Sequence, residues 1–175
     1  MRRSTERGFT LVEIMIVVAI IALLAAIAIP NVLRGRTTAN ETAAVGNLRA
    51  LVSSLEMARS VNNTYPLTAN WAANMYTTPD PDFGPPSFNH PMDGTACPSG
   101  AASSCTQGYR YTYTSGAGTT YTLLATPDTL GTTGTRSFVA TEAGLIRHCT
   151  GTGTAANMTD ATPAPTIDAP VVACD

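Results

Sequence analysis

The stretch from Phe9 to Ile29, FTLVEIMIVVAIIALLAAIAI, is an apolar run of 21 residues. An α-helix rises about 1.5 Å per residue, so a helix of this length spans about 30 Å, the thickness of the hydrocarbon core of a bilayer. Only Thr10 and Glu13 interrupt the run with polar side chains. The sequence therefore predicts a helix that crosses a membrane.

The residues before the run indicate its orientation. Arg2, Arg3 and Arg7 outnumber Glu6 in this short segment. Because positively charged flanks stay on the cytoplasmic side, we expect the N-terminus in the cytoplasm and the remainder of the chain outside.

Three simple interpretations compete for the apolar run. A secretory signal peptide is supported by Ala26-Ile27-Ala28, which resembles a signal peptidase site, but its apolar region is usually about 7–15 residues long. A plain membrane anchor is the second interpretation. A buried core helix is the third, and the run is too long and too uniformly apolar for it. None of the three explains Glu13, because a carboxylate inside a membrane helix costs about 2.5–3.5 kcal/mol and usually has a partner.

The segment Arg7-Gly8-Phe9-Thr10-Leu11-Val12-Glu13 resembles the cleavage and methylation motif of type IV pilins and of the pseudopilins of type II secretion. The resemblance continues through the apolar run to Pro30. It implies that a prepilin peptidase removes residues 1–8 by cutting between Gly8 and Phe9 and then methylates the new amine of Phe9. The apolar helix stays on the mature protein.

The resemblance also implies a role for Glu13. In the family, the glutamate at this position neutralises the N-terminal amine of a neighbouring subunit during assembly, which lowers the cost of two lone charges in an apolar core. The alternative is that Glu13 contacts only the amine of its own Phe9, four residues back on the same helical face.

The helix is expected to continue beyond the apolar run. Pro30 lacks an N–H group, so it predicts a kink, or alternatively a helix end at Ile29. The next residues, 34–60, contain no proline, and apolar residues recur at helical spacing. We therefore expect one helix over about 10–60, with a membrane or filament-core part at 9–33 and an amphipathic part at 34–60. The predicted apolar stripe consists of Val45, Leu48, Val52 and Leu55.

Residues 61–175 are expected to form a globular head. A Pro-, Gly- and Asn-rich loop at 61–106 comes first, with Trp71 and Phe83 as packing anchors, and a C-terminal loop occupies 150–175. Alternating apolar and polar residues within 107–149 predict an antiparallel sheet of about four strands, with tyrosines in the core. The fold class is thus α+β, and the layout resembles the type IV pilin fold. The expected strands are 108–114, 119–126, 137–141 and 145–148.

Four cysteines, Cys97, Cys105, Cys149 and Cys174, suggest disulfides in an exported domain, with three possible pairings. A Cys149–Cys174 bond would resemble the C-terminal disulfide loop of many pilins. The cysteines lack the close C-x₂₋₄-C spacing of zinc sites.

Composition and motifs argue against an enzyme or a nucleic-acid binder. Charged residues make up 13% of the chain and the net charge is −2, so no basic patch for nucleic acid is expected. No catalytic or phosphate-binding motif is present. We expect no cofactor and no metal, since Asp160, Asp168 and Asp175 do not form the dense pattern of a calcium site.

The sequence favours a structural subunit of a type IV pilus-like filament. Its expected partners are other copies of itself, the prepilin peptidase, an inner-membrane assembly platform and the membrane before assembly. We expect it first in the inner membrane and then in an extracellular pilus or a periplasmic filament. The alternative is a pseudopilin of type II secretion, and a soluble exported domain behind a signal peptide is the third hypothesis. The two expected head disulfides and the long variable loop favour the pilus.

Overall fold

The computed structural model describes residues 9–94 and 105–151. The chain divides into two compact units, one up to Arg36 and one from Thr37 onward. Helix α1, Leu11–Asn62, contributes to both units. Because Pro30 lies inside α1, the alternative of a helix end at Ile29 is wrong.

The first unit is an apolar helical segment whose side chains are open to the surroundings. From Phe9 to Leu33 the large apolar side chains are 47–79% exposed. One 18-residue window of α1 has a mean hydropathy of 3.0 and no buried residue, so this helix is long and apolar enough to cross a membrane.

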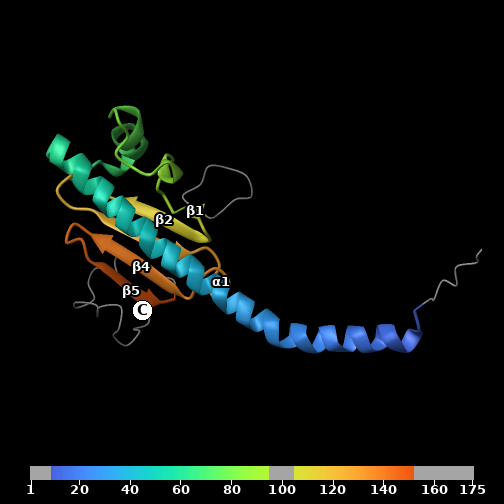
Figure 1. Cartoon of the computed structure of the whole chain (residues 1–175). Coiled ribbons are helices and arrows are strands. Elements are labelled where there is room, and N and C mark those ends of the chain that lie inside the picture. Colours follow the sequence, from blue (N-terminus) through green and yellow to red (C-terminus); the bar gives the residue numbers. More distant parts are fainter. Residues whose placement is uncertain (1–8, 95–104, 152–175) are drawn as a thin grey trace, which may run out of the picture. The chain divides into compact units, whose positions relative to one another are not determined.

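The second unit contains a five-stranded antiparallel sheet in which each strand pairs with the next along the chain (Figure 1). The α+β class and the antiparallel sheet are confirmed. The extra strand is β1, whose two residues are too few to show an alternating pattern in the sequence. The strands are β1 Cys105–Thr106, β2 Tyr109–Thr114, β3 Thr122–Pro127, β4 Arg136–Thr141 and β5 Ile146–Thr150.

The part of α1 in the second unit lies across one face of the sheet (Figure 1). Leu48 and Leu55 of the predicted stripe are fully buried, whereas Val45 and Val52 are only partly buried at its margin. Leu51, which the predicted stripe omitted, is fully buried. Alternating spacings of four and three residues keep these positions on one helical face. The buried apolar stripe is Ala44, Leu48, Leu51, Leu55 and Ala58.

The tyrosines of β2 form the sheet's side of the core. Tyr109, Tyr111 and Tyr113 are each at most 1% exposed, which confirms their predicted packing role. Buried hydroxyls need hydrogen-bond partners. Tyr109 Oη donates to the carbonyl of Arg136 at 2.7 Å and Tyr113 Oη to that of Pro66 at 2.7 Å. The tyrosine rings of β2 therefore pack in the core, while their hydroxyls hydrogen-bond to neighbouring segments of the chain.

The connection after α1 is irregular, as expected, with three short helical turns at Thr68–Asn70, Ala73–Thr77 and Pro86–Phe88. Trp71 is 2% exposed and its Nε1 donates to the carbonyl of Phe88 at 3.0 Å. Phe83 is partly buried against the same core. Both residues thus anchor the connection by packing.

Candidate functional site

The N-terminal end of α1 carries the residues predicted to act in processing and assembly. Phe9 is 79% exposed, whereas Gly8 lies outside the described residues. Glu13 is exposed and belongs to the first turn of the helix. Cleavage between Gly8 and Phe9, methylation of Phe9 and the assembly role of Glu13 stay predictions.

Thr10 caps the helix, a feature that was not among the expectations from the sequence. Its Oγ1 accepts a hydrogen bond from the backbone N–H of Glu13 at 3.2 Å. A threonine followed three residues later by glutamate is the signature of a capping box, so the sequence did contain the signal. The carboxylate of Glu13 thereby lies at the positive end of the helix dipole, where negative charge is stabilised.

This arrangement leaves the Glu13 carboxylate available to an external cation. Among the residues that the structure describes, the carboxylate makes no ion pair, and the cap uses only its backbone N–H. An ammonium group brought up by another molecule would therefore find an accessible carboxylate in an apolar surrounding.

Pro30 sits within the apolar part of α1 and removes one backbone donor from the helix. The neighbouring Asn31 donates its side-chain amide to the carbonyl of Ile27 at 3.2 Å. The helix continues through this position, and the kink predicted at Pro30 stays a prediction.

A buried carboxylate fastens the second unit's part of α1 to the sheet. Glu41 is 6% exposed and accepts hydrogen bonds from Thr135, from its N–H at 2.8 Å and its hydroxyl at 2.7 Å. Arg136, at the start of β4, donates from Nε at 2.8 Å and from Nη2 at 2.6 Å to the other oxygen. Such a two-pronged pair fixes orientation as well as distance.

Opposing effects act on the pKa of Glu41. Burial alone raises the pKa of this carboxyl, but the hydrogen bonds from Thr135 and the charge and hydrogen bonds of Arg136 outweigh it and lower the pKa below its ordinary value. Glu41 is therefore ionised and satisfied at neutral pH. No sequence pattern indicates this contact, because a single acidic residue on a helix is usually solvated and Arg136 comes 95 residues later.

Two asparagines of α1 extend this attachment. Asn40 donates to the carbonyl of Thr133 at 2.9 Å, beside the Glu41 contact. Further along the helix, Asn47 donates to Tyr111 Oη at 3.0 Å. Burial raises the pKa of Tyr111 to about 12, so its hydroxyl is protonated and accepts this bond at neutral pH.

Only half of the predicted cysteine set falls within the described residues. Cys105 in β1 and Cys149 in β5 do not carry free thiols. Cys97 and Cys174 lie outside the described residues, so the pairing stays a prediction. In residues 9–94 and 105–151, no three His, Cys, Asp or Glu side chains cluster in a way that would hold a metal ion. The acidic residues Asp160, Asp168 and Asp175 lie outside those ranges.

Comparison with known proteins shows which of them this chain is similar to. Residues 3–29 match the model of the prokaryotic N-terminal methylation motif. The chain is 36% identical over 94 residues to type II secretion system core protein G of Klebsiella michiganensis, covering 54% of this chain and 65% of the relative. It is 35% identical over 89 residues to the core protein G of Pseudomonas aeruginosa, covering 51% and 63%.

A pilus protein is also among the relatives. The chain is 49% identical over 67 residues to the type IV wide pilus major component PilA4 of Thermus thermophilus, covering 38% of this chain and 50% of the relative. In each of these three matches the chain spans between half and about two thirds of the relative's length. No solved structure matches the chain significantly. The methylation motif, the apolar N-terminal helix and the antiparallel sheet that follows it in the chain together make this chain similar to the type IV pilins and pseudopilins.

Proposed function

We propose that this chain is a filament subunit that is cleaved between Gly8 and Phe9. The mature chain resides in the inner membrane and then assembles with other copies of itself through its apolar helix. The observation that supports this most directly is the helix surface from Phe9 to Leu33. Its apolar side chains are 47–79% exposed, and nothing in the described residues covers them. Exposed apolar surface of this extent needs lipid or other helices around it.

The charge arrangement suits such an assembly. Removal of residues 1–8 creates a positive amine at Phe9, and Glu13 offers an accessible carboxylate in the first turn. A pair of opposite charges costs far less in an apolar core than two separate ones. The proposed assembly contact joins the amine of one copy to the Glu13 carboxylate of its neighbour.

Within the family, we propose a pseudopilin of a type II secretion system. Support comes from the extent of the similarity, since at most 62 residues precede the end of α1 and the matches to core protein G run over 68–94 residues, against 67 residues for PilA4. Residues of the head therefore take part in this similarity. This interpretation replaces the pilus as the leading hypothesis from the sequence.

A type IV pilus subunit remains the second candidate. The 49% identity to PilA4 is higher than the 34–37% identity to the core G proteins, although it covers only 67 residues. Deletion of the gene separates the two candidates. Loss of exoprotein secretion with unchanged surface pili supports the pseudopilin, whereas loss of surface pili with unchanged secretion supports the pilin.

Processing is tested by the intact mass and N-terminal sequence of the mature protein from a membrane or sheared filament fraction. A chain that begins at methylated Phe9 agrees with the proposal. A chain that begins near Ile29 would mean signal-peptide cleavage and would remove the apolar helix from the mature protein.

The role of Glu13 is tested by Glu13→Ala and Glu13→Gln. Both variants keep the backbone N–H that Thr10 caps, so α1 begins normally. We expect normal membrane insertion and a filament yield at least tenfold lower for both, because neither supplies a negative charge. Wild-type filament yield from Glu13→Gln would contradict the proposed charge pairing.

A further inference from the structure

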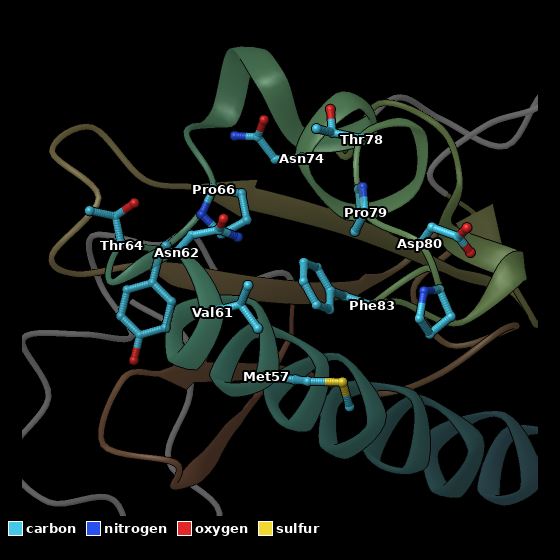
Figure 2. Close-up of a pocket in the computed structure, with 12 residues that line it drawn as sticks. Met57, Val61, Asn62, Thr64, Pro66, Asn74, Thr78, Pro79, Asp80 and Phe83 are labelled. Carbon is cyan, nitrogen blue, oxygen red and sulfur yellow. The ribbon is translucent and has the colours of Figure 1, made fainter.

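A groove of about 760 Å³ lies beside the C-terminal end of α1 (Figure 2). Figure 2 shows Met57 and Val61 on the helix at one side and Pro79 and Phe83 on the following loop at the other. Met57 is 51% exposed and Val61 63% exposed, so apolar side chains of the groove face solvent. Its polar lining consists of Asn62, Thr64, Asn74, Thr78 and Asp80.

An exposed apolar tip occurs elsewhere on the head, in the loop between β3 and β4. Leu130 is 52% exposed, and its neighbours Thr129, Gly131 and Thr132 are exposed as well. The loop is held in shape by its own hydrogen bonds, from Gly131 N to Gly134 O at 2.8 Å and from Thr133 N to Thr129 O at 2.9 Å. A pre-formed loop of this kind loses little entropy when it docks.

The groove and the loop tip lie at opposite ends of the head. The loop is tied to the beginning of the second unit's part of α1, because Thr133 O accepts a hydrogen bond from Asn40 and Thr135 donates to Glu41. The groove includes Val61, which is 20 residues further along the same helix. At a helical rise of 1.5 Å per residue, Glu41 and Val61 are about 30 Å apart along the axis of α1.

We propose that the groove of one copy receives the Leu130 loop of another copy in the assembled filament. The groove is larger than one leucine side chain and suits the tip of a loop. Its apolar side chains would surround Leu130, while the hydroxyls of Thr129 and Thr132 would meet the amides and hydroxyls of the rim. The contact joins two different surfaces, and such heterologous contacts propagate into open helical assemblies unless the rotation closes a ring.

The other exposed leucine of the sheet's turns provides a contrast. Leu145 is 61% exposed and follows β4 in the turn before β5. The turn follows Thr141, and Thr141 pairs with Thr122 of β3. The residue before Thr122 is Tyr121, whose ring packs against the ring of Tyr65. Tyr65 in turn lines the groove. Leu145 thus lies at the same end of the head as the groove. A contact between Leu145 and the groove of another copy could not join successive copies head to tail along a filament.

The contact rests on the proposed filament function and is small compared with interfaces that hold stable dimers. Packing of the apolar helices holds the copies together at a high effective concentration, so a weak head contact becomes effective only in the filament. The contact would therefore add to the stability of the assembled filament without holding free subunits together.

Photocrosslinking in filaments tests the proposal. A benzoylphenylalanine replaces Leu130 in the full-length chain, in cells that assemble the filament, and the matched control carries it at Leu145. We expect Leu130 crosslinks to residues of the groove in another copy, identified by mass spectrometry, and no such crosslink from Leu145. Filaments whose Leu130 crosslinks map elsewhere, or are absent, would overturn the docking contact and leave the filament function intact. A wild-type chain that forms no filament would overturn both.

Charge substitutions give a second, independent measurement. Leu130→Asp and Val61→Asp are each expected to lower filament yield about tenfold, whereas Leu145→Asp stays close to wild type. Membrane insertion and the thermal unfolding of the head, followed by Trp71 fluorescence, are expected to be unchanged in all three variants. Wild-type filament yield from both Leu130→Asp and Val61→Asp would contradict the proposal.

Discussion

Two regions of α1 differ in what covers their apolar side chains. From Leu11 to Leu33 the large apolar side chains stay 47–75% exposed, and polar residues are rare. From Ala44 to Ala58 the apolar stripe is fully buried against the sheet, and nearby polar residues such as Asn47 have specific partners. One helix therefore meets two different surroundings along its length.

The difference indicates that only one of the two regions stabilises the head by burial within the chain itself. Burial of apolar surface contributes about 25 cal/mol per Å², so the region that packs on the sheet stabilises the head. The exposed region gains this free energy only when lipid or other copies cover it. Substitutions in the two regions should therefore have effects that can be separated experimentally.

The largest expected effect comes from removing core volume. Leu51→Ala leaves a cavity at a side chain that is fully buried, so we expect the free energy of unfolding to fall by about 2–5 kcal/mol. Ile20→Ala, at a position 53% exposed, should change it by less than about 0.5 kcal/mol. The measurement is denaturant unfolding of the full chain in detergent micelles, followed by fluorescence of Trp71, the single tryptophan. Equal losses in the two variants would remove the distinction between the regions.

Loss of the buried carboxylate should be nearly as costly. Glu41→Ala leaves the Arg136 guanidinium and the two donors of Thr135 without their acceptor. We expect the free energy of unfolding to fall by about 2–4 kcal/mol. The Arg136 side chain is 32% exposed, so water compensates for part of the loss. Arg49→Ala, at an exposed position of the same helix, serves as the control and should change stability by less than about 0.5 kcal/mol. A loss no greater than that of the control would mean that the Glu41 contact adds nothing.

Two tyrosine hydroxyls allow a finer test of the core. Tyr113→Phe leaves the buried carbonyl of Pro66 without its hydrogen-bond donor, so we expect the free energy of unfolding to fall by about 1–3 kcal/mol. Tyr121 Oη is buried and has no partner among the described residues, so Tyr121→Phe should be neutral or stabilising. Thermal unfolding of the two variants, measured side by side, checks this difference. A greater loss from Tyr121→Phe would reveal a partner for its hydroxyl.

The smallest expected effect is on the pH dependence of stability. Because the folded state lowers the pKa of Glu41, its contribution is present above the ordinary carboxyl pKa of about 4.3 and is lost as the pH falls through the lower folded value. Wild type should therefore lose more stability between neutral pH and about pH 3 than Glu41→Gln. Parallel pH profiles of the two proteins would contradict the lowered pKa.

Sequence patterns were most informative where a physical period or a short motif operates locally. The apolar run predicted the long helix, and alternating residues such as Tyr109, Tyr111 and Tyr113 predicted a strand and its buried face. The two-residue β1 escaped detection because it is too short to show a period. Leu51 was missed because the assumed stripe followed Val45 and Val52, and only packing on the sheet showed which face lies at the centre.

The sequence by itself determined the features that depend on neighbouring residues: the apolar helix, the methylation motif before it, the alternation in the strands and the class of fold. Only the tertiary structure decided that Glu41 meets Thr135 and Arg136, and that the groove at Val61 and the tip at Leu130 lie at opposite ends of the head. The physical reason is distance along the chain. Helical and strand periods are set within a few residues, whereas a buried ion pair or a groove requires segments tens of residues apart to be brought together by the packing of the core.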